Sequence, residues 1–532
     1  MMIKSFNHLI DKLTPRILTQ VCRDPNSKTY GCFDRNWWHY KIRDFSSIIL
    51  QQGGYYCCLL ADNENYIRQK KELELIALAS VKFWMRKALK YGAFEEYYPW
   101  ENGYPPLAFS TLAITKICNK LDYSSNEMDL CLKKASKQLV RKYENKALNQ
   151  QVAGLAALCN IYAYNNTFVS DESIMTLLNK IIEEQNEDGW FPEYGGPDIG
   201  YLSVTIDCLW DIYDIFQDQR IIKSIKKAII FIDNVLFENS SIGMHNSRNT
   251  DYIVPYGIFR TYINKNIKCH RESESIINKI FQNLNKKNHY IYAIDDRYWI
   301  HYIGHSYVRA TNIINQYKIE IASFEKKDNK ENLNIYPSSG YIIKKGRLLS
   351  YIISSSKGGN ISAKIKSGNY KKFSDFGWVI RMDKKQYVTC WWGNSELKVN
   401  FKNRYLIKGY LVATKETVSN PFYHVILRFM SLLFGNFIIS FLKKKLIFIK
   451  NSDFYPFERD IVFEKDTIII KDKFYNLSSN VEIVRAPRSS KRHVASADSF
   501  HMEDNSLISN MIIKEKREKK KNYFLIISNY EY

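Results

Sequence analysis

Paired cysteines of the kind that bind zinc or build a disulfide framework are missing from this sequence. Its ten cysteines are scattered, apart from the adjacent Cys57 and Cys58, and no Cys-x-x-Cys motif occurs. Regular spacing of that kind marks structural zinc sites and small secreted domains. We therefore expect reduced, buried thiols in a cytoplasmic protein, with neither a metal nor a cofactor.

Long apolar runs are also missing. Asp11 and Lys12 interrupt the N-terminal segment, so no secretion signal is expected. The most apolar segment, Phe422–Lys450, has an uncharged run of 14 residues, 429–442, whereas a membrane-spanning helix needs roughly 20. The pattern favours a buried or domain-packing helix followed by a strand. The alternative is an interfacial helix that places Lys443–Lys445 near anionic headgroups at the inner membrane.

Acidic residues are outnumbered by basic ones. The 77 Lys and Arg against 55 Asp and Glu give a formal net charge of +22. Such an excess attracts polyanions, and it is also typical of a generally basic surface. Zinc-finger, helix-turn-helix and RNA-binding signatures do not accompany it, so no nucleic acid partner is expected. The expected partner is an acidic polysaccharide or oligosaccharide, with anionic lipid as the alternative.

The apolar spacing changes once along the chain. Up to residue 324 it has mostly a helical period, as in Glu72–Tyr91. From residue 336 it alternates with a period of two and is rich in β-branched and aromatic residues. Helices followed by strands indicate separate domains. We predict an α+β multidomain protein with a helical domain at 1–324, a linker at 325–335, and an antiparallel β-sandwich at 336–532 that carries an apolar helical insertion near 422–445.

The helical half repeats one plan, in which a helix leads through a polar or aromatic loop into a second helix. The second helices are expected to start near Leu107, Gln151, Tyr201 and Pro255, which are 44, 50 and 54 residues apart. Degenerate periodicity of this size indicates stacked helical hairpins. Hairpins that close on themselves form an α/α toroid, whose inner helices point their unpaired N–H groups at one rim. That rim is the expected binding site.

The loop at 186–200 is crowded with aromatic and acidic residues. Aromatic faces stack on sugar rings or line an apolar pocket, and carboxylates accept hydrogen bonds from hydroxyl groups. The structural alternative is that Trp190 packs between repeats and Asp198 caps the next helix. The substrate-binding candidates of this region are Trp190, Glu193, Tyr194, Asp198 and Tyr201.

The densest polar cluster of the chain lies at 245–256. Its composition suits removal of a proton next to a uronate carboxyl, because Asn and Arg stabilise the enolate-like charge while His and Tyr transfer the proton. A tyrosine, with an ordinary pKa of about 10, needs a nearby cation to act as the base. The alternative is a hydrogen-bonded loop between repeats. The catalytic candidates here are His245, Asn246, Arg248, Tyr252 and Tyr256.

Three further places carry candidates. His301 and His305 share a face if their stretch is helical, and we predict a substrate-binding role for His301 and a catalytic one for His305. A third ligand for a metal is not evident beside them. Arg35 and His39 are candidates for the wall of the cleft, although a structural ion-pair knot around them is the preferred interpretation. The polar loop at 486–501 either reaches over the cleft or lies on the surface.

The segments "DGWFPEYGGPDIGYLS" (188–203), "HNSRNTDYIVPYG" (245–257) and "FERDIVFEKDTIIIKDKF" (457–474) give the chain a resemblance to heparinase II/III-like proteins over most of its length. The resemblance implies an α/α toroid followed by an antiparallel β-sandwich. It also implies polysaccharide lyase chemistry, in which uronate-containing chains are cleaved by β-elimination. Some of these proteins are associated with bacterial surface-polysaccharide gene clusters.

By this resemblance, Asn246 and Arg248 neutralise the substrate carboxylate, Tyr256 or Tyr252 is the acid, and His245 or His305 is the base. The sequence departs from the family in having no secretion signal and no complete His/Tyr/Asn set in family order. The resemblance therefore implies the biosynthesis or remodelling of a surface glycan rather than its degradation outside the cell.

Other functions stay open. A non-catalytic glycan-binding or assembly protein keeps an aromatic cleft without depending on His245 or Tyr256. A uronyl C5-epimerase uses the same proton abstraction. The segment 186–213 is also similar to the repeats of terpene cyclases, but the acidic DxDD or DDxxD motif of those enzymes does not occur.

Overall fold

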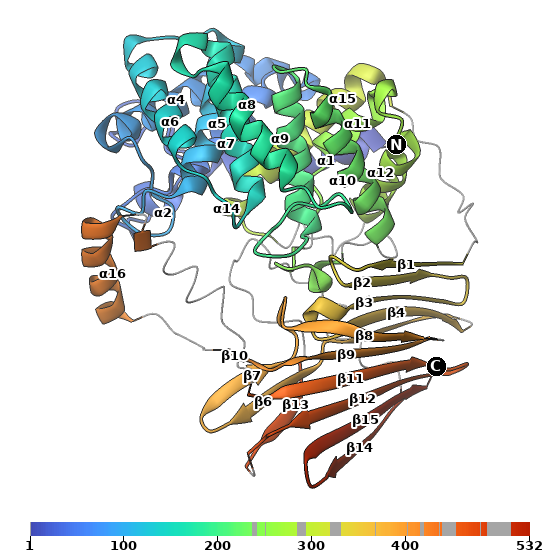
Figure 1. Cartoon of the computed structure of the whole chain (residues 1–532). Coiled ribbons are helices and arrows are strands. Elements are labelled where there is room, and N and C mark those ends of the chain that lie inside the picture. The colour runs from blue at the N-terminus through green and yellow to red at the C-terminus, as the bar shows by residue number, and fades with distance from the viewer. Residues whose placement is uncertain are drawn as a thin grey trace.

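A computed structural model describes most of the chain (Figure 1). The described residues are 2–236, 242–250, 252–284, 294–319, 331–367, 369–401, 403–414, 420–435, 437–438, 454–478, 480–486 and 512–531. Most of the expected linker lies outside them, as do residues 439–453 with Lys443–Lys445 and the polar loop from 487 onward.

Helices form the first part of the chain. The inner helices are α3 (Gln52–Leu60), α5 (Tyr104–Leu121), α7 (Leu148–Tyr164), α9 (Ile199–Tyr213), α11 (Tyr256–Ile263) and α15 (Gly304–Tyr317). The outer helices are α1 (Met2–Leu18), α4 (Lys70–Tyr91), α6 (Asn126–Arg141), α8 (Asp171–Glu183), α10 (Gln219–Val235) and α12 (His270–Leu284). Short helical segments are α2 (Arg35–Trp38), η1 (Ile48–Gln51), η2 (Glu64–Gln69), η3 (Asn166–Phe168), η4 (Gly243–His245), η5 (Lys265–Ile267), α14 (Asp296–Tyr298) and η6 (Trp299–Ile303).

The inner helices form a closed ring. Each contacts the next in the order α3, α5, α7, α9, α11 and α15, and α15 contacts α3 again. They are apolar on nearly all sides, because the ring interior and the outer helices cover them: every residue of α7 from Gln151 to Ile161 is buried. Outer helices such as α6 and α10 bury one stripe only. The predicted α/α toroid is confirmed, and α5, α7, α9 and α11 begin within three residues of the predicted starts.

Antiparallel strands form three sheets in the second part of the chain. The five-stranded sheet contains β1 (Asn332–Tyr336), β2 (Tyr341–Lys345), β3 (Leu349–Ser354), β4 (Asn360–Ser367) and β5 (Asn369–Asp375), with η7 (Ser355–Lys357) between β3 and β4. The four-stranded sheet is ordered β10 (Val412–Thr414), β7 (Lys385–Val388), β6 (Trp378–Met382) and β13 (Glu482–Arg485). The six-stranded sheet is ordered β14 (Ile512–Lys519), β15 (Tyr523–Glu531), β12 (Thr467–Tyr475), β11 (Pro456–Phe463), β9 (Arg404–Tyr410) and β8 (Ser395–Phe401).

The five-stranded sheet lies between the toroid and the six-stranded sheet (Figure 1). Successive residues of β2 point to opposite faces, so that Tyr341 and Ile343 join the core of the toroid while Ile342 joins the core between the sheets. The antiparallel sandwich predicted from the period of two is thus confirmed. β1 begins at Asn332, a few residues before the predicted start of the sandwich.

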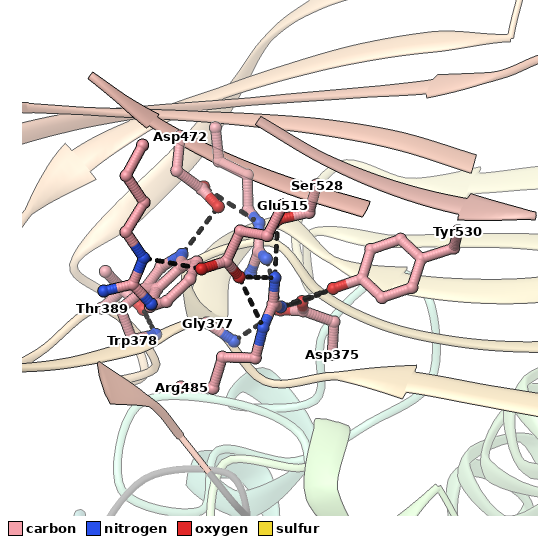
Figure 2. A network of polar contacts seen from close by, with 11 residues as sticks. Asp375, Gly377, Trp378, Thr389, Asp472, Arg485, Glu515, Ser528 and Tyr530 are labelled. Atoms are coloured by element: carbon pink, nitrogen blue, oxygen red, sulfur yellow. Dashed lines mark hydrogen bonds and ion pairs between the residues drawn. The ribbon is translucent and has the colours of Figure 1, made fainter. Parts of the chain in front are cut away.

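A buried polar network connects the three sheets (Figure 2). The carboxylate of Asp375, at the end of β5, accepts hydrogen bonds from Arg459 of β11, from Arg485 of β13 at 2.5 Å and from the Tyr530 hydroxyl of β15 at 2.6 Å. Burial opposes ionisation of this carboxyl, but the two guanidinium groups lower the pKa of Asp375 to about 2. The charged groups of this network pair with one another, so the network holds the sheets together.

The apolar insertion contains helix α16 (Pro421–Phe434), which lies on the flank of the molecule near α2 (Figure 1). The expectation of a buried or domain-packing helix is wrong, because Ser431 is its only buried residue. The strand expected after it falls outside the described residues. Among the helices that the structure describes, none is both long and apolar enough to cross a bilayer.

Candidate functional site

The short helices α2 and α14 lie at the end of the toroid that faces the sheets (Figure 1). The loops that enter α9 and α11 meet at this end, because Thr250 of the second loop binds Asp198 of the first. Backbone hydrogen bonds fix them further: the Ser247 N–H donates to the Pro197 carbonyl at 2.9 Å. Two of the loops that were expected at one rim therefore meet.

The loop at 190–198 is held from inside. Trp190 is buried, and the N–H of Glu193 donates to the Gly196 carbonyl at 2.8 Å. The Glu193 carboxylate accepts a hydrogen bond from the Asn149 N–H at the start of α7 at 2.7 Å, while its second oxygen has no partner among the described residues. Burial raises the pKa of Glu193 well above its ordinary value. Both residues thus stiffen the loop.

Asp198 performs the helix-capping role that the sequence left as the alternative. Its carboxylate accepts the Tyr201 N–H at 3.1 Å as the N-cap of α9, and it also accepts the N–H of Thr250 at 3.3 Å and the Thr250 hydroxyl. Burial raises the pKa of Asp198, although these donors counteract it. The residue therefore couples two rim loops.

Arg248 is the cation of this region with unused donors. Its guanidinium lies over the Tyr194 ring, 4.4 Å from the centroid, and two of its nitrogens, Nε and Nη2, have no hydrogen-bond partner among the described residues. The side chain is half-buried. Its charge acts on Glu193 and Asp198, lowering the pKa of both against the effect of burial. Both nitrogens are buried, and a guanidinium whose donors lack a partner within the described residues is a candidate for a ligand carboxylate.

His245 and Asn246 face the sheets instead. The His245 Nε2 lies 3.0 Å from the Ser362 hydroxyl of β4. The amide of Asn246 holds the loop, since its oxygen lies 3.3 Å from the Ile199 N–H and its nitrogen donates to the Thr250 carbonyl at 3.1 Å. The ammonium of Lys357 donates to the Asn246 carbonyl at 2.6 Å. These two residues therefore join the toroid to the five-stranded sheet.

Aromatic side chains form a continuous group beside Asp198. The Tyr252 and Tyr302 hydroxyls are 2.8 Å apart, and the Tyr201 ring meets the Tyr252 ring edge-on with centroids 6.3 Å apart. His301 contacts Tyr302 and, at 5.3 Å between centroids, Tyr298. We call Tyr201, Tyr252, Tyr298, His301 and Tyr302 the rim cluster.

A local irregularity places His301 in this cluster. The segment Trp299–Ile303 is a π-helix, and His301 departs from helical geometry with φ −60° and ψ −159°. Its Nε2 has no partner among the described residues. Burial, then Arg297, lowers the pKa of His301 well below its ordinary value. Arg297, which is paired with Glu96 at 3.2 Å, therefore places a positive charge near His301.

Tyr256 and His305 belong to a different group, inside the ring. The guanidinium of Arg309 lies over the Tyr256 ring, 3.2 Å from its centroid, and pairs with Asp211 of α9. His305 contacts the Tyr55 ring and lies 3.4 Å from the Gln52 side chain. The stretch is not a regular α-helix, because Trp299–Ile303 is a π-helix, yet His305 lies close enough to His301 to contribute to its lowered pKa. Tyr256 therefore belongs to the ring interior, and His305 lies between that group and His301 of the rim cluster.

The candidates near the N-terminus lie apart from both groups. His39 is exposed, and Arg35 lines a surface cavity of about 310 Å³ together with Trp38 and Arg23. The expected ion-pair knot exists in part: Arg43 binds Asp34 at 2.5 Å. Asp34 also accepts the Ser47 N–H at 2.7 Å, which ties this loop to the start of η1.

Sequence reasoning missed Tyr298, Tyr302, Arg297 and Lys357. The first two flank His301 in "DRYWIHYIGH", and tyrosines on both sides of that candidate histidine were the available signal. Lys357 gave no signal, because it lies in the sheet half and reaches the loop at 244–249 only through the fold.

The comparisons with known proteins concern the fold. No protein-family model matches the sequence, and none of the curated proteins matches it. Three solved structures are similar to the chain. Heparinase III has a TM-score of 0.45 at 10% identity over 99% of this chain and 87% of that chain. A mutant of the heparan sulfate lyase HepC from Pedobacter heparinus has a TM-score of 0.39 at 11% identity over 99% and 83%. Chondroitinase AC lyase has a TM-score of 0.30 at 9% identity over 82% and 68%. These likenesses assign neither a substrate nor a catalytic residue to the chain.

Proposed function

We propose that this protein acts on an acidic, uronate-containing polysaccharide by lyase-like β-elimination. The observation that carries the proposal is the hydroxyl contact of Tyr252 with Tyr302 beside the unpartnered Nε2 of His301. β-Elimination needs one group that removes the proton next to the uronate carboxyl and another that protonates the departing oxygen. The rim cluster offers both kinds of group in one place.

The protonation states of His301 and of the two tyrosines indicate which group is the base and which is the acid. Burial and Arg297 lower the pKa of His301, so its imidazole is neutral at pH 7, and we assign proton abstraction to Nε2 because it is the nitrogen without a partner. Burial raises the pKa of Tyr252 and Tyr302 well above 10, so both hydroxyls keep their protons. We therefore assign the base to His301 and the acid to the tyrosine pair, which replaces the earlier assignment of these roles to His245, His305 or Tyr256.

Arg248 is the residue that we assign to the substrate carboxylate. Neutralising that carboxylate makes the neighbouring proton more acidic, because the negative charge that develops is stabilised. The guanidinium has two nitrogens without a partner, whereas the Asn246 amide is engaged in its own loop. Tyr194, under the guanidinium, orients it.

The test is turnover of a panel of uronate-containing polysaccharides, followed by the ultraviolet absorbance of the unsaturated product. We expect Tyr302→Phe to lower kcat by on the order of a hundredfold to ten-thousandfold while glycan binding changes little, because only the transferable proton is removed. The matched control is Tyr213→Phe, on the half-buried end of α9, which should keep full activity. Full activity of Tyr302→Phe would rule out this acid.

A non-catalytic glycan-binding protein is the second candidate. It is favoured by the burial of the rim cluster, since Tyr252 is 1% and His301 is 4% exposed. A binder would show affinity for the same glycans without unsaturated product. A uronyl C5-epimerase would incorporate solvent deuterium without cleaving the chain. These readouts separate the three functions on one panel.

The setting that we infer is the biosynthesis or remodelling of a bacterial surface glycan in a reducing compartment. All ten cysteines are free and buried, which supports the reducing compartment, cytoplasmic in our proposal. Glycosyltransferase and polysaccharide-export genes next to this one would support the setting, and a neighbourhood of unrelated genes would count against it.

A further inference from the structure

Helix α16 is attached to the molecule by its polar side. Along the helix, Arg428 and Ser431 lie on one face, and Ser431 is buried. Arg428 forms a bidentate ion pair with Asp44, in the loop after α2. A helix on a globular protein normally buries its apolar stripe and exposes its polar one. The arrangement of α16 is the reverse.

The outward side of α16 is apolar over most of its circumference. Phe422 is 69%, Val425 65% and Phe429 61% exposed. The exposed apolar side chains of the helix are Phe422, Tyr423, Val425, Ile426, Phe429, Met430, Leu432, Leu433 and Phe434. Contiguous exposed apolar surface of this kind marks an interaction site. The helix carries no acidic residue.

Two contacts attach α16 to the toroid: the Arg428–Asp44 ion pair and the contact of Gly435 with Asn102. Tyr40 and Ile42, close to Asp44, are exposed. At the other end of α16, a Cβ on Gly435 would meet the Asn102 side chain at 3.3 Å, so the helix ends against the loop before α5. Ion pair and contact together fix the helix with its apolar side turned outward.

We propose that α16 is an interfacial helix that binds the surface of an anionic bilayer. Fourteen residues span about 21 Å along a helix axis, too little to cross the hydrocarbon core but enough to lie in the interface. We choose an anionic bilayer as the binding partner of α16 on the basis of charge. The formal net charge of +22 favours an anionic surface, and α16 has no acidic group that would repel it. A bilayer also accommodates a convex apolar helix without a matching groove.

The experiment is sedimentation of the full-length protein with phosphatidylcholine vesicles that contain or lack phosphatidylglycerol. We expect binding to the anionic vesicles that weakens as salt is raised. The double variant Val425→Asp with Phe429→Asp should lose on the order of a hundredfold in vesicle affinity, because two apolar side chains no longer enter the interface. Both positions are exposed, so the fold is retained, as circular dichroism will check.

The control is a second pair of substitutions, Ile67→Asp with Leu75→Asp, which places the same two charges at exposed apolar positions of η2 and α4. It should bind vesicles as the wild type does. The proposal is overturned if the wild type does not sediment with anionic vesicles, or if the double variant binds as well as the control. It is equally overturned if α16 instead joins two copies of the chain, seen as a dimer in analytical ultracentrifugation that the double variant abolishes while vesicles bind neither form.

Discussion

Single buried residues set how this protein responds to pH, and His245 is the clearest case. Burial and the ammonium of Lys357 lower its pKa to about 3, whereas an unfolded histidine titrates near about 6.5. The folded state therefore binds fewer protons than the unfolded one between these values. The stability contributed by the neutral imidazole is present above roughly pH 6.5 and is lost as the pH falls toward 3.

We therefore expect the stability difference between the wild type and His245→Gln to depend on pH. Relative to the variant, the wild type should lose about 1.4 kcal/mol for each pH unit below roughly pH 6.5. Urea unfolding at a series of pH values measures this, with His39→Gln as the control because His39 is exposed. A difference that stays constant from about pH 7 to pH 5 would contradict the burial of a neutral imidazole.

Among the elements, α9 depends on a single residue at its start. Asp198→Ala removes the N-cap and leaves the donors of Thr250 without their acceptor, so we expect a loss of about 2–3 kcal/mol in the free energy of unfolding. Ser170→Ala, which removes the exposed N-cap of α8, should cost about 1 kcal/mol or less in the same urea titration. Weaker glycan binding with unchanged stability would instead assign Asp198 to the substrate.

The elements themselves were predictable from the sequence, whereas their fine geometry was not. Small and apolar residues on all sides of α7 predict a buried helix. Alternating apolar and polar residues along β11 predict a strand with one buried face. In the π-helix before α15, backbone N–H groups bond to a carbonyl one residue further back than in an α-helix, and apolar spacing does not reveal this difference. The contact of His301 with Tyr302 was therefore not predicted. The start of α11 at Tyr256 follows the expected start near Pro255, but the position of the Tyr256 ring under Arg309 depends on Asp211 of another helix and was not predictable from local sequence.

The whole molecule is a toroid and a sandwich in direct contact, and at this joint the sandwich supplies a buried charge to the toroid loop at 244–249. Lys357 is fully buried at the end of η7. Its ammonium donates to the Met244 carbonyl at 3.0 Å, the Asn246 carbonyl at 2.6 Å and the Asn249 side chain. These acceptors lie in the loop that leads to Tyr252, so the sheet half fixes the backbone from which the proposed acid projects.

Replacing that ammonium tests whether the two halves stabilise each other. Lys357→Met keeps the length of the side chain but removes the buried ammonium from its three acceptors, and we expect a cost of about 3–5 kcal/mol. Because the loss falls at the joint, we expect calorimetry to resolve two unfolding transitions for the variant and a single one for the wild type. Lys345→Met is the matched control: this half-buried lysine donates to the Asp233 carbonyl across the same joint at 3.2 Å, and its loss should lower stability by about 1 kcal/mol without splitting the transition. A single, unshifted transition for Lys357→Met would mean that the apolar contacts of Tyr341 and Ile343 with the toroid core couple the halves without it.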